Sequence, residues 1–384
     1  MVMMQILLIL AVMALVGCGE SSVDKAISKN AQLRVEARNI VEKAVRIELK
    51  KPPKSILTES DFLKVTKLQF GYAAKITDKD LKDIAKLQNL AYLDLGYNKI
   101  TDADLKEVAK LQKLEWLSLH GTRFTHESLK EVAKLQQLKF LDLGNTLNTG
   151  KSLNELVKLQ ELRVLNLDNT KITDADLKEV DKLQKLEELS MHGTEVTDAG
   201  LKEVTKLQEL RMLDLGNTQI TDAGIKEVTK LQELRVLDLG NTQITDAGLK
   251  EVAKLQELRV LDLGYNKITD AGIKEMIKLQ QLTTLDLSNT QITDVGLKEV
   301  TKLQKLKKLD LGFNKITDAG LKEVAMLEKL EELYLYRTQI TNESLKDLSK
   351  LQKLEFIILS GTEITKSSAA ELKKALPNCR IDGP

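Results

Sequence analysis

The centre of this chain is one 24-residue unit repeated almost letter for letter. From Leu210 the sequence reads LRMLDLGNTQITDAGIKEVTKLQE, and it begins again at Leu234 and at Leu258. Such a fixed period is typical of repeats that stack into one elongated domain, because each repeat buries its apolar face only against its neighbours. Twelve full units are each opened by a leucine, at positions 90, 114, 138, 162, 186, 210, 234, 258, 282, 306, 330 and 354.

Each unit combines two periodicities. The L-x-x-L-x-L segment alternates, which predicts a short strand with two inward leucines. The D-A-G-L-K-E-V-x-K-L segment predicts a helix of two to three turns, with the preceding Thr as its N-cap and an Asp222–Lys226 ion pair that recurs along the stack. We therefore expect an α/β solenoid whose curved parallel sheet forms the concave face and whose short helices form the convex face.

The pattern L-x-x-L-x-L-x-x-[TN]-x-I-T-D-x-G-L resembles the leucine-rich repeat. It is similar to the bacterial 24-residue group, which is akin to the repeats of eukaryotic F-box substrate receptors. The resemblance covers residues 57–384 and implies a protein-binding role. Most units have Thr where the family has Asn, which we interpret as subtype variation, and Asn148 replaces the usual Ile, which predicts a local loosening.

The N-terminal segment predicts export. Residues 1–17 are uncharged, and their apolar run is shorter than the ~20 residues of a membrane span but has the size of a signal peptide. The segment ends Leu15-Val16-Gly17-Cys18 and resembles a bacterial lipobox, which implies cleavage before Cys18 and lipidation of that residue. It departs from such signals in having no Lys or Arg ahead of the apolar run. An ordinary secretory signal and a cytoplasmic protein are the alternatives.

The expected organisation has four parts. Residues 1–17 are a lipoprotein signal peptide, and residues 18–56 are an anchor and linker with a capping helix. Residues 57–371 are one shortened repeat and twelve full ones, and residues 372–384 are a C-terminal cap. In the shortened repeat we expect Leu68 and Phe70 to point inward. The helical pattern of residues 23–51 predicts a cover for the open end of the stack, or alternatively an amphipathic partner-binding helix.

Aromatic residues gather where the strands should face outward, at the third, fifth, seventh and eighth positions of the units. Nine of the thirteen aromatic residues lie there. Exposed Trp, Tyr and Arg often dominate binding energy, so we predict ligand binding here, although aromatic ladders also stabilise neighbouring strands. One predicted cluster comprises Tyr92, Trp116 and Phe140, and the other comprises Tyr334, Tyr336, Arg337 and Phe356.

The fifth position carries a column of carboxylates. Its members are Asp214, Asp238, Asp262, Asp286 and Asp310, with Asp94 and Asp142 upstream. Carboxylates on adjacent strands repel one another, so calcium or a basic partner is one interpretation. We favour a structural role, with Arg211, Arg235 and Arg259 neutralising three of the column residues. His120 and His192 share the seventh position but lie three repeats apart, ~14 Å, which is too far to share a metal.

Composition and motifs narrow the function classes. The 58 basic and 57 acidic residues nearly cancel, so no basic field favours nucleic acid. The sequence shows no catalytic triad, phosphate loop or Cys/His cluster, so we expect neither an enzyme nor a cofactor or metal. We expect a monomer that is lipid-anchored in the bacterial cell envelope and binds a protein or peptide. Gly19, where inner-membrane retention would commonly place Asp, favours the outer membrane or cell surface.

Other ligands and roles stay open at this point. A glycan stacking on Tyr92, Trp116 and Phe140 is a further possible ligand. A passive structural envelope lipoprotein is the main alternative function, since near-identical repeats give a uniform surface. A role like that of F-box receptors is remote, because residues 18–56 are too short for an F-box.

Overall fold

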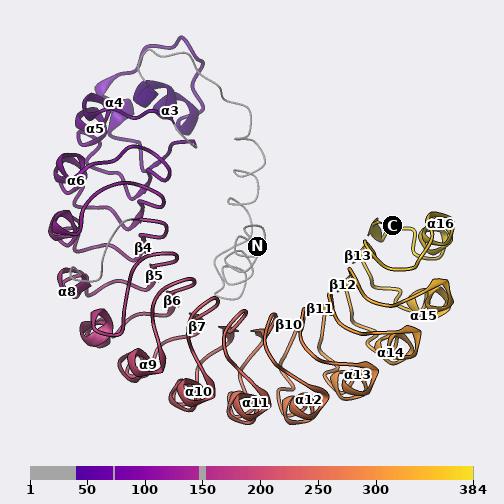
Figure 1. The fold of residues 1–384 in the computed structure, drawn as a ribbon. Coiled ribbons are helices and arrows are strands. Elements are labelled where there is room, and N and C mark those ends of the chain that lie inside the picture. The colour runs from indigo at the N-terminus through magenta and orange to yellow at the C-terminus, as the bar shows by residue number, and fades with distance from the viewer. Residues whose placement is uncertain (1–39, 72–73, 147–152, 384) are drawn as a thin grey trace. The chain divides into compact units, whose positions relative to one another are not determined.

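The computed structural model describes residues 40–71, 74–146 and 153–383 (Figure 1). These form two compact units, one up to Lys171 and one from Ile172. Within each unit the strands follow one another in chain order as a parallel sheet, and short helices alternate with them. The predicted leucine-rich-repeat solenoid is therefore confirmed.

The first unit holds β1 to β5 and the helices between them. Paired residues of its full repeats lie 24 positions apart, as Tyr92 and Trp116 do, so the sheet register is the sequence period. The bounds are α3 Ile40–Glu48, α4 Glu59–Phe62, β1 Lys67–Gln69, α5 Asp78–Ile84, β2 Tyr92–Asp94, α6 Asp102–Val108, β3 Trp116–Ser118, η2 His126–Ser128, α7 Leu129–Val132, β4 Phe140–Asp142, α8 Leu153–Leu156 and β5 Val164–Asn166.

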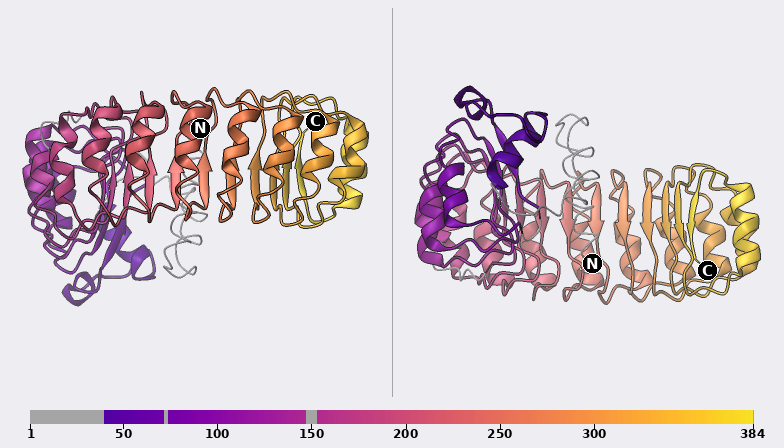
Figure 2. Two further views of the ribbon diagram at one scale, coloured as in Figure 1. Left: turned by 90° about the horizontal axis from the view of Figure 1, so that it is seen from below. Right: turned by 90° about the horizontal axis from the view of Figure 1, so that it is seen from above.

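The second unit continues the same alternation. Figure 2 shows its row of helices from below and its row of strands from above. The bounds are η4 Asp176–Lys182, β6 Glu188–Ser190, α9 Asp198–Val204, β7 Met212–Asp214, α10 Asp222–Val228, β8 Val236–Asp238, α11 Asp246–Val252, β9 Val260–Asp262, α12 Asp270–Met276, β10 Thr284–Asp286, α13 Asp294–Val300, β11 Lys308–Asp310, α14 Asp318–Val324, β12 Glu332–Tyr334, η5 Asn342–Ser344, α15 Leu345–Leu348, β13 Phe356–Ile358, α16 Lys366–Ala375 and β14 Arg380–Asp382.

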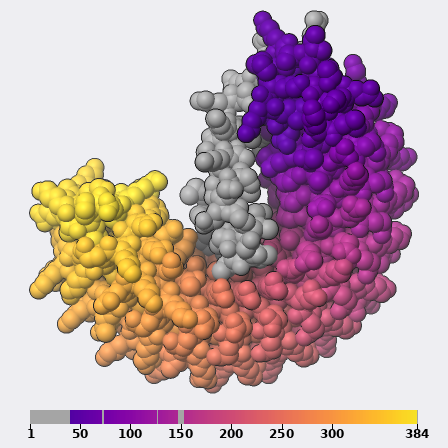
Figure 3. Space-filling model, turned by 180° about the vertical axis from the view of Figure 1, so that it is seen from behind, coloured from indigo at the N-terminus to yellow at the C-terminus, as the bar shows by residue number. Residues whose placement is uncertain are grey.

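The core lies between the strand row and the helix row of each unit. The repeated leucines are buried, as Leu210, Leu213 and Leu215 illustrate. In the shortened first repeat Leu68 and Phe70 are buried as expected. Within each unit, successive repeats stay in contact without a gap in the space-filling view (Figure 3), so burial of one leucine column is continuous there.

In most repeats of the second unit, a carboxylate near the start of the helix joins one repeat to the next. Asp222 accepts hydrogen bonds from the Thr245 amide at 2.9 Å and the Thr245 hydroxyl at 2.6 Å. The same pair of bonds recurs along the second unit from Asp174 to Asp318. The predicted Asp222–Lys226 ion pair is therefore wrong, because both carboxylate oxygens serve Thr245. The helix ion pairs form instead between Glu227 and Lys230 and their equivalents.

In the units with glycine or aspartate at the fifteenth position, that residue indicates which carboxylate accepts the hydrogen bonds of this threonine. Where it is glycine, the carboxylate comes from the preceding repeat and lies against the glycine; a Cβ built on Gly248 would stand 2.4 Å from Asp222 Oδ1. Where it is aspartate, this aspartate accepts the hydrogen bonds of the threonine in its own repeat. The Asp104 carboxylate accepts from both the amide and the hydroxyl of Thr101, each at 2.8 Å, as part of a capping box. With either residue at this position, the threonine amide and hydroxyl both find a carboxylate acceptor.

The ninth position also has two forms. The Thr242 hydroxyl donates to the Leu239 carbonyl within its own repeat. The Asn266 amide donates to the Leu239 carbonyl of the preceding repeat and to the Leu263 carbonyl of its own. Asn266 and Asn314 therefore bridge two repeats, whereas the bonds of Asn98 stay within its own repeat.

The termini of the repeat array are closed differently. At the N-terminal end α3 buries Val41 and Val45 and contacts β1 and α5. At the C-terminal end β14 pairs with β13.

Within the described residues, no helix is both long enough and apolar enough to cross a membrane. The predicted signal peptide, Cys18 and the predicted loosening at Asn148 lie outside the described residues.

Candidate ligand-binding surfaces

Three aromatic rings form a stack on the first unit. Tyr92, Trp116 and Phe140 occupy equivalent positions on β2, β3 and β4, so strand pairing brings them side by side. The centroids are 3.9 Å apart between Tyr92 and Trp116 and 4.4 Å between Trp116 and Phe140, with interplanar angles of 10° and 11°. Each stacked pair stabilises the sheet by about 1 kcal/mol beyond its buried area.

This stacking covers the ring faces. The faces between Tyr92, Trp116 and Phe140 lie against one another, and Lys67 Nζ stands 4.3 Å from the centroid of the Tyr92 ring. Trp116 has a stacked ring on each face, so a sugar could stack on it only by displacing Tyr92 or Phe140.

The C-terminal aromatic cluster consists of two separate pairs. Tyr334 and Phe356 meet edge to face at 5.6 Å, and Phe313 and Tyr336 meet at 5.3 Å. The predicted grouping of Tyr334, Tyr336, Arg337 and Phe356 is therefore incomplete, because Tyr336 and Arg337 pack on Phe313.

Cations accompany both pairs. Lys308 Nζ lies 4.9 Å from the centroid of the Tyr334 ring and 3.0 Å from a Glu332 carboxylate oxygen. Arg380 lies over Phe356 at 5.4 Å, and Arg337 lies over Phe313 at 5.1 Å. Sequence reasoning missed Lys308 and Arg380, although both stand next to aromatic positions in the strand register. The surface combines ring edges with three cationic groups, which suits an apolar partner segment that carries carboxylates.

The eighth position of every unit adopts a left-handed backbone. Asparagine or glycine fills it in most repeats, as in Asn289 with φ of 49° and Gly361 with φ of 74°. Four repeats place a larger side chain there: Tyr97, Tyr265, Phe313 and Arg337, with φ between 55° and 60°. A left-handed conformation costs such residues about 1 kcal/mol relative to glycine or asparagine. The recurrence of Asn or Gly at the eighth position is the sequence pattern that indicates a left-handed backbone there.

These costly side chains are also exposed. Tyr97, Tyr265 and Phe313 are 43%, 51% and 39% exposed, so burial of their rings does not offset the energetic cost of the left-handed backbone. Tyr97 borders a shallow hollow of about 430 Å³ that Arg123 and Asn145 also line. Backbone strain that is kept at exposed aromatic side chains is typical of functional sites rather than of packing.

The acidic column is buried rather than facing solvent. Asp214, Asp238, Asp262, Asp286 and Asp310 are between 3% and 8% exposed. Each accepts a hydrogen bond from the backbone N–H two residues later, as Asp238 does from Gly240 at 2.8 Å. This corrects the expectation of an outward column and gives each carboxylate a local role at the strand end.

Burial makes ionisation of this column unfavourable. Desolvation, with the charges of Asp214 and Asp262 adding to it, raises the pKa of Asp238 well above its ordinary range. Desolvation and the neighbouring Asp286 raise the pKa of Asp310 to about 8. Burial therefore makes the charged forms of Asp238 and Asp310 unfavourable.

The predicted arginine neutralisation of the column is not observed. Arg211 forms its ion pair with Glu187, at 3.3 Å, instead of with Asp214. The Arg235 Nε is buried without a hydrogen-bond partner. Arg235, three positions before Asp238, thus does not relieve the charge of the column, and Arg259 forms no ion pair within the described part of the chain.

Each seventh-position histidine lies against a column carboxylate. His120 Nδ1 is 3.2 Å from Asp142 Oδ1, and His192 Nδ1 is 3.6 Å from Asp214 Oδ1. Burial alone would lower the pKa of His120, but the hydrogen bond to Asp142 and the charges of Asp142, Asp168 and Asp94 together outweigh this and raise the pKa. Near His192 a second carboxylate, Asp238, completes a group whose ligand atoms lie within 4.8 Å of one another. The sequence pattern indicated only that the two histidines are too far apart to share a metal, and it did not reveal this group of one histidine and two aspartates.

Known proteins give the same architecture. A family model described as a leucine-rich repeat region matches residues 49–222 and 223–380. An internalin of Listeria monocytogenes is 27% identical with a TM-score of 0.61, over 88% of this chain and 93% of the internalin. A leucine-rich-repeat protein of Leptospira interrogans is 30% identical with a TM-score of 0.57, over 78% of this chain and 74% of that one. No curated relative matches the chain. The chain therefore belongs to the leucine-rich-repeat family.

Proposed function

We propose that this protein is a lipid-anchored component of the bacterial cell envelope, and that it binds another protein or peptide through the strand-bearing faces of its repeats. The observation that carries the binding proposal is the set of exposed side chains held in left-handed backbone at the eighth position. Membership of a repeat family similar to internalins supports a binding role over an enzymatic one.

The second unit offers the most developed surface for a partner. Phe313 and Arg337 lie against each other on neighbouring repeats, both with positive φ, and Tyr336 packs edge-on against Phe313. Tyr334 and Phe356 extend this surface across β12 and β13. Selection for stability alone would have placed asparagine at the two left-handed positions, as in Asn289. Their side chains are therefore retained for a contact that the isolated protein does not make.

Replacing Phe313 and Arg337 with asparagine separates binding from stability. We expect Phe313→Asn/Arg337→Asn to unfold at a higher temperature, because each change relieves about 1 kcal/mol of backbone strain. The loss of ring and guanidinium contacts should weaken partner capture about tenfold or more. Thermal unfolding followed by circular dichroism gives the stability, and quantitative mass spectrometry of proteins captured from a cell-envelope extract gives the binding.

The matched control is Met326→Ala, which removes a 59% exposed apolar side chain two residues after the end of α14. Capture should be the same for this control and the wild type. If the asparagine double variant gains stability and still captures the same proteins at the same level, the passive structural role replaces the binding role.

The proposed anchor rests on residues 15–18 and has its own test. Intact-mass analysis of protein extracted from membranes should show a chain that begins at a lipidated Cys18. Cys18→Ala should leave the protein unlipidated and shift it from the membrane fraction to the soluble fraction after lysis. A wild-type mass equal to that of the full unmodified chain would refute the anchor and leave the binding proposal standing.

A further inference from the structure

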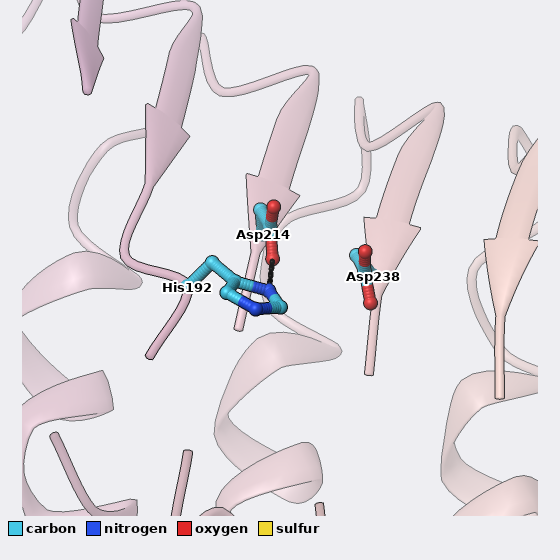
Figure 4. Close-up of side chains that lie close together, drawn as sticks. All are labelled: His192, Asp214 and Asp238. Carbon is cyan, nitrogen blue, oxygen red and sulfur yellow. Dashed lines mark ion pairs between the residues drawn. The ribbon is translucent and has the colours of Figure 1, made fainter. Parts of the chain in front are cut away.

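We propose that His192, Asp214 and Asp238 form a binding site for a divalent transition-metal ion of the zinc type. The three side chains come from three consecutive repeats of the second unit: His192 follows β6, Asp214 ends β7 and Asp238 ends β8. Figure 4 shows them on the same side of neighbouring strands, with the imidazole turned toward Asp214.

The distances are close to those of a zinc site. Metal–ligand bonds of about 2.0–2.2 Å in a tetrahedron place ligand atoms about 3.4 Å apart. His192 Nδ1 and Asp214 Oδ1 are already 3.6 Å apart, and the atoms offered by all three residues lie within 4.8 Å of one another. A side-chain rotation that moves the Asp238 carboxylate by about 1 Å would give the ion three protein ligands and leave its fourth coordination position open.

The backbone keeps the space between the ligands free. A Cβ built on Gly216 would stand 2.6 Å from His192 Nδ1 and 3.0 Å from Asp238 Oδ1. Any larger residue at this seventh position would therefore displace two of the proposed ligands. The His192 side chain remains 12% exposed, which gives an ion a route from solvent.

The charge around the site favours a cation. Asp238 is 7% exposed, and its carboxylate accepts one backbone N–H. No lysine or arginine among the described residues forms an ion pair with it, and the nearest column neighbours, Asp214 and Asp262, are also carboxylates. A buried carboxylate without a cationic partner is costly unless it is protonated or bound to a metal.

A hard cation fits this group less well. Calcium takes six to eight oxygen ligands, whereas the two carboxylates of Asp214 and Asp238 supply at most four. An imidazole beside two carboxylates is instead the mixed nitrogen and oxygen donor set that suits zinc and related ions.

The first unit contains a natural counterpart that lacks one ligand. His120 and Asp142 repeat the histidine–carboxylate contact, and a Cβ built on Gly144 would likewise stand 2.8 Å from His120 Nδ1. The third residue there is Asn166, whose Oδ1 lies 3.0 Å from the same Cβ position. Because a neutral amide is a much weaker ligand than a carboxylate, this counterpart should bind zinc poorly.

The experiment is titration calorimetry of the full-length, detergent-extracted chain with Zn²⁺ after removal of bound metal by a chelator. We expect one ion per chain, and we expect His192→Ala and Asp238→Asn each to weaken binding about tenfold or more. Asn166→Asp, which completes the counterpart in the first unit, should raise the stoichiometry from one ion to two.

Folding and specificity are checked in the same series. Circular dichroism must show unchanged secondary structure for each variant, and Zn²⁺ should raise the unfolding temperature of the wild type but not of His192→Ala. Zn²⁺ binding that is unchanged in both His192→Ala and Asp238→Asn would overturn the proposal, as would Ca²⁺ binding of equal strength. An absence of Zn²⁺ binding by the wild type would overturn it directly.

Discussion

Gly248→Ala is expected to lower the free energy of unfolding by about 3 kcal/mol, although the same change stabilises an ordinary helix by up to about 1 kcal/mol. Gly248 lies in α11, and an added Cβ would stand 2.4 Å from Asp222 Oδ1 and 3.0 Å from Ile244 Cγ2. The Asp222 carboxylate would have to move away from Thr245, so the two hydrogen bonds that join these repeats would break.

A double-variant cycle isolates this cause. In an Asp222→Ala background the carboxylate is already absent, so Gly248→Ala should become neutral or stabilising. Hydrogen exchange of the Thr245 amide gives a local readout, which is preferable because long repeat arrays unfold in more than one step. If alanine at position 248 costs the same with and without Asp222, the clash with the carboxylate is not the cause.

The two solutions at the fifteenth position also allow a rescue. Gly248→Asp combined with Asp222→Ala should recover part of the stability that Asp222→Ala loses, because it reproduces the arrangement of Thr101 with Asp104. The same amide-exchange measurement at Thr245 should show its protection restored. Gly248→Ala in the Asp222→Ala background serves as the control, since alanine offers no acceptor to the threonine.

Asp310→Asn is expected to stabilise the protein by at least about 2 kcal/mol at pH 9 and to have little effect near pH 4. Burial raises the pKa of Asp310 to about 8, with Asp286 adding to the rise and Lys308 and the Tyr336 hydroxyl opposing it. The unfolded state releases this proton near pH 4 and the folded state near pH 8. Wild-type stability therefore falls as pH rises between these values, and the cost is complete above about pH 8.

Asparagine avoids that cost while keeping the contacts. Its carbonyl can still accept the Gly312 N–H, which now donates to Asp310 Oδ1 at 2.8 Å, and it never ionises. Asn166 already occupies the equivalent position on β5 and accepts the Asp168 amide in the same way. Denaturant unfolding at several pH values between 4 and 9, with chelator present, measures the effect. A variant whose stability parallels that of the wild type across this range would show that Asp310 does not titrate abnormally.

The fold was predictable because its information is repeated. Leucine alternation and helix spacing recur in register, so an error in one repeat is corrected by its neighbours. The register of Tyr92, Trp116 and Phe140 followed directly from the 24-residue spacing. The inter-repeat bond between Asp222 and Thr245 was missed, because a helix pattern suggests partners within one repeat and gives no sign of an acceptor 23 residues away.

The candidate sites were less predictable because they depend on depth and backbone conformation. Alternation placed Asp238 on the outward side of its strand, but the turn that follows folds its own N–H groups over the carboxylate and buries it. The strain at Phe313 was invisible until φ was known, although the asparagines at equivalent positions hinted at it. Charge pairing across repeats also defeated prediction, since Arg211 pairs with Glu187 rather than with an aspartate of the column.

The seam between Asp222 and Thr245 has a consequence for how such a protein can change its length. The seams from Asp174 to Asp318 are all made by the same pair of residue types, so any of these repeats can follow any other. Adding or removing one 24-residue repeat between His192 and Phe313 would change the distance between the His192 site and the Phe313 surface by one strand spacing, about 4.8 Å. The local geometry of each would stay unchanged. The number of repeats thus works as an adjustable spacer, set independently of what either surface binds.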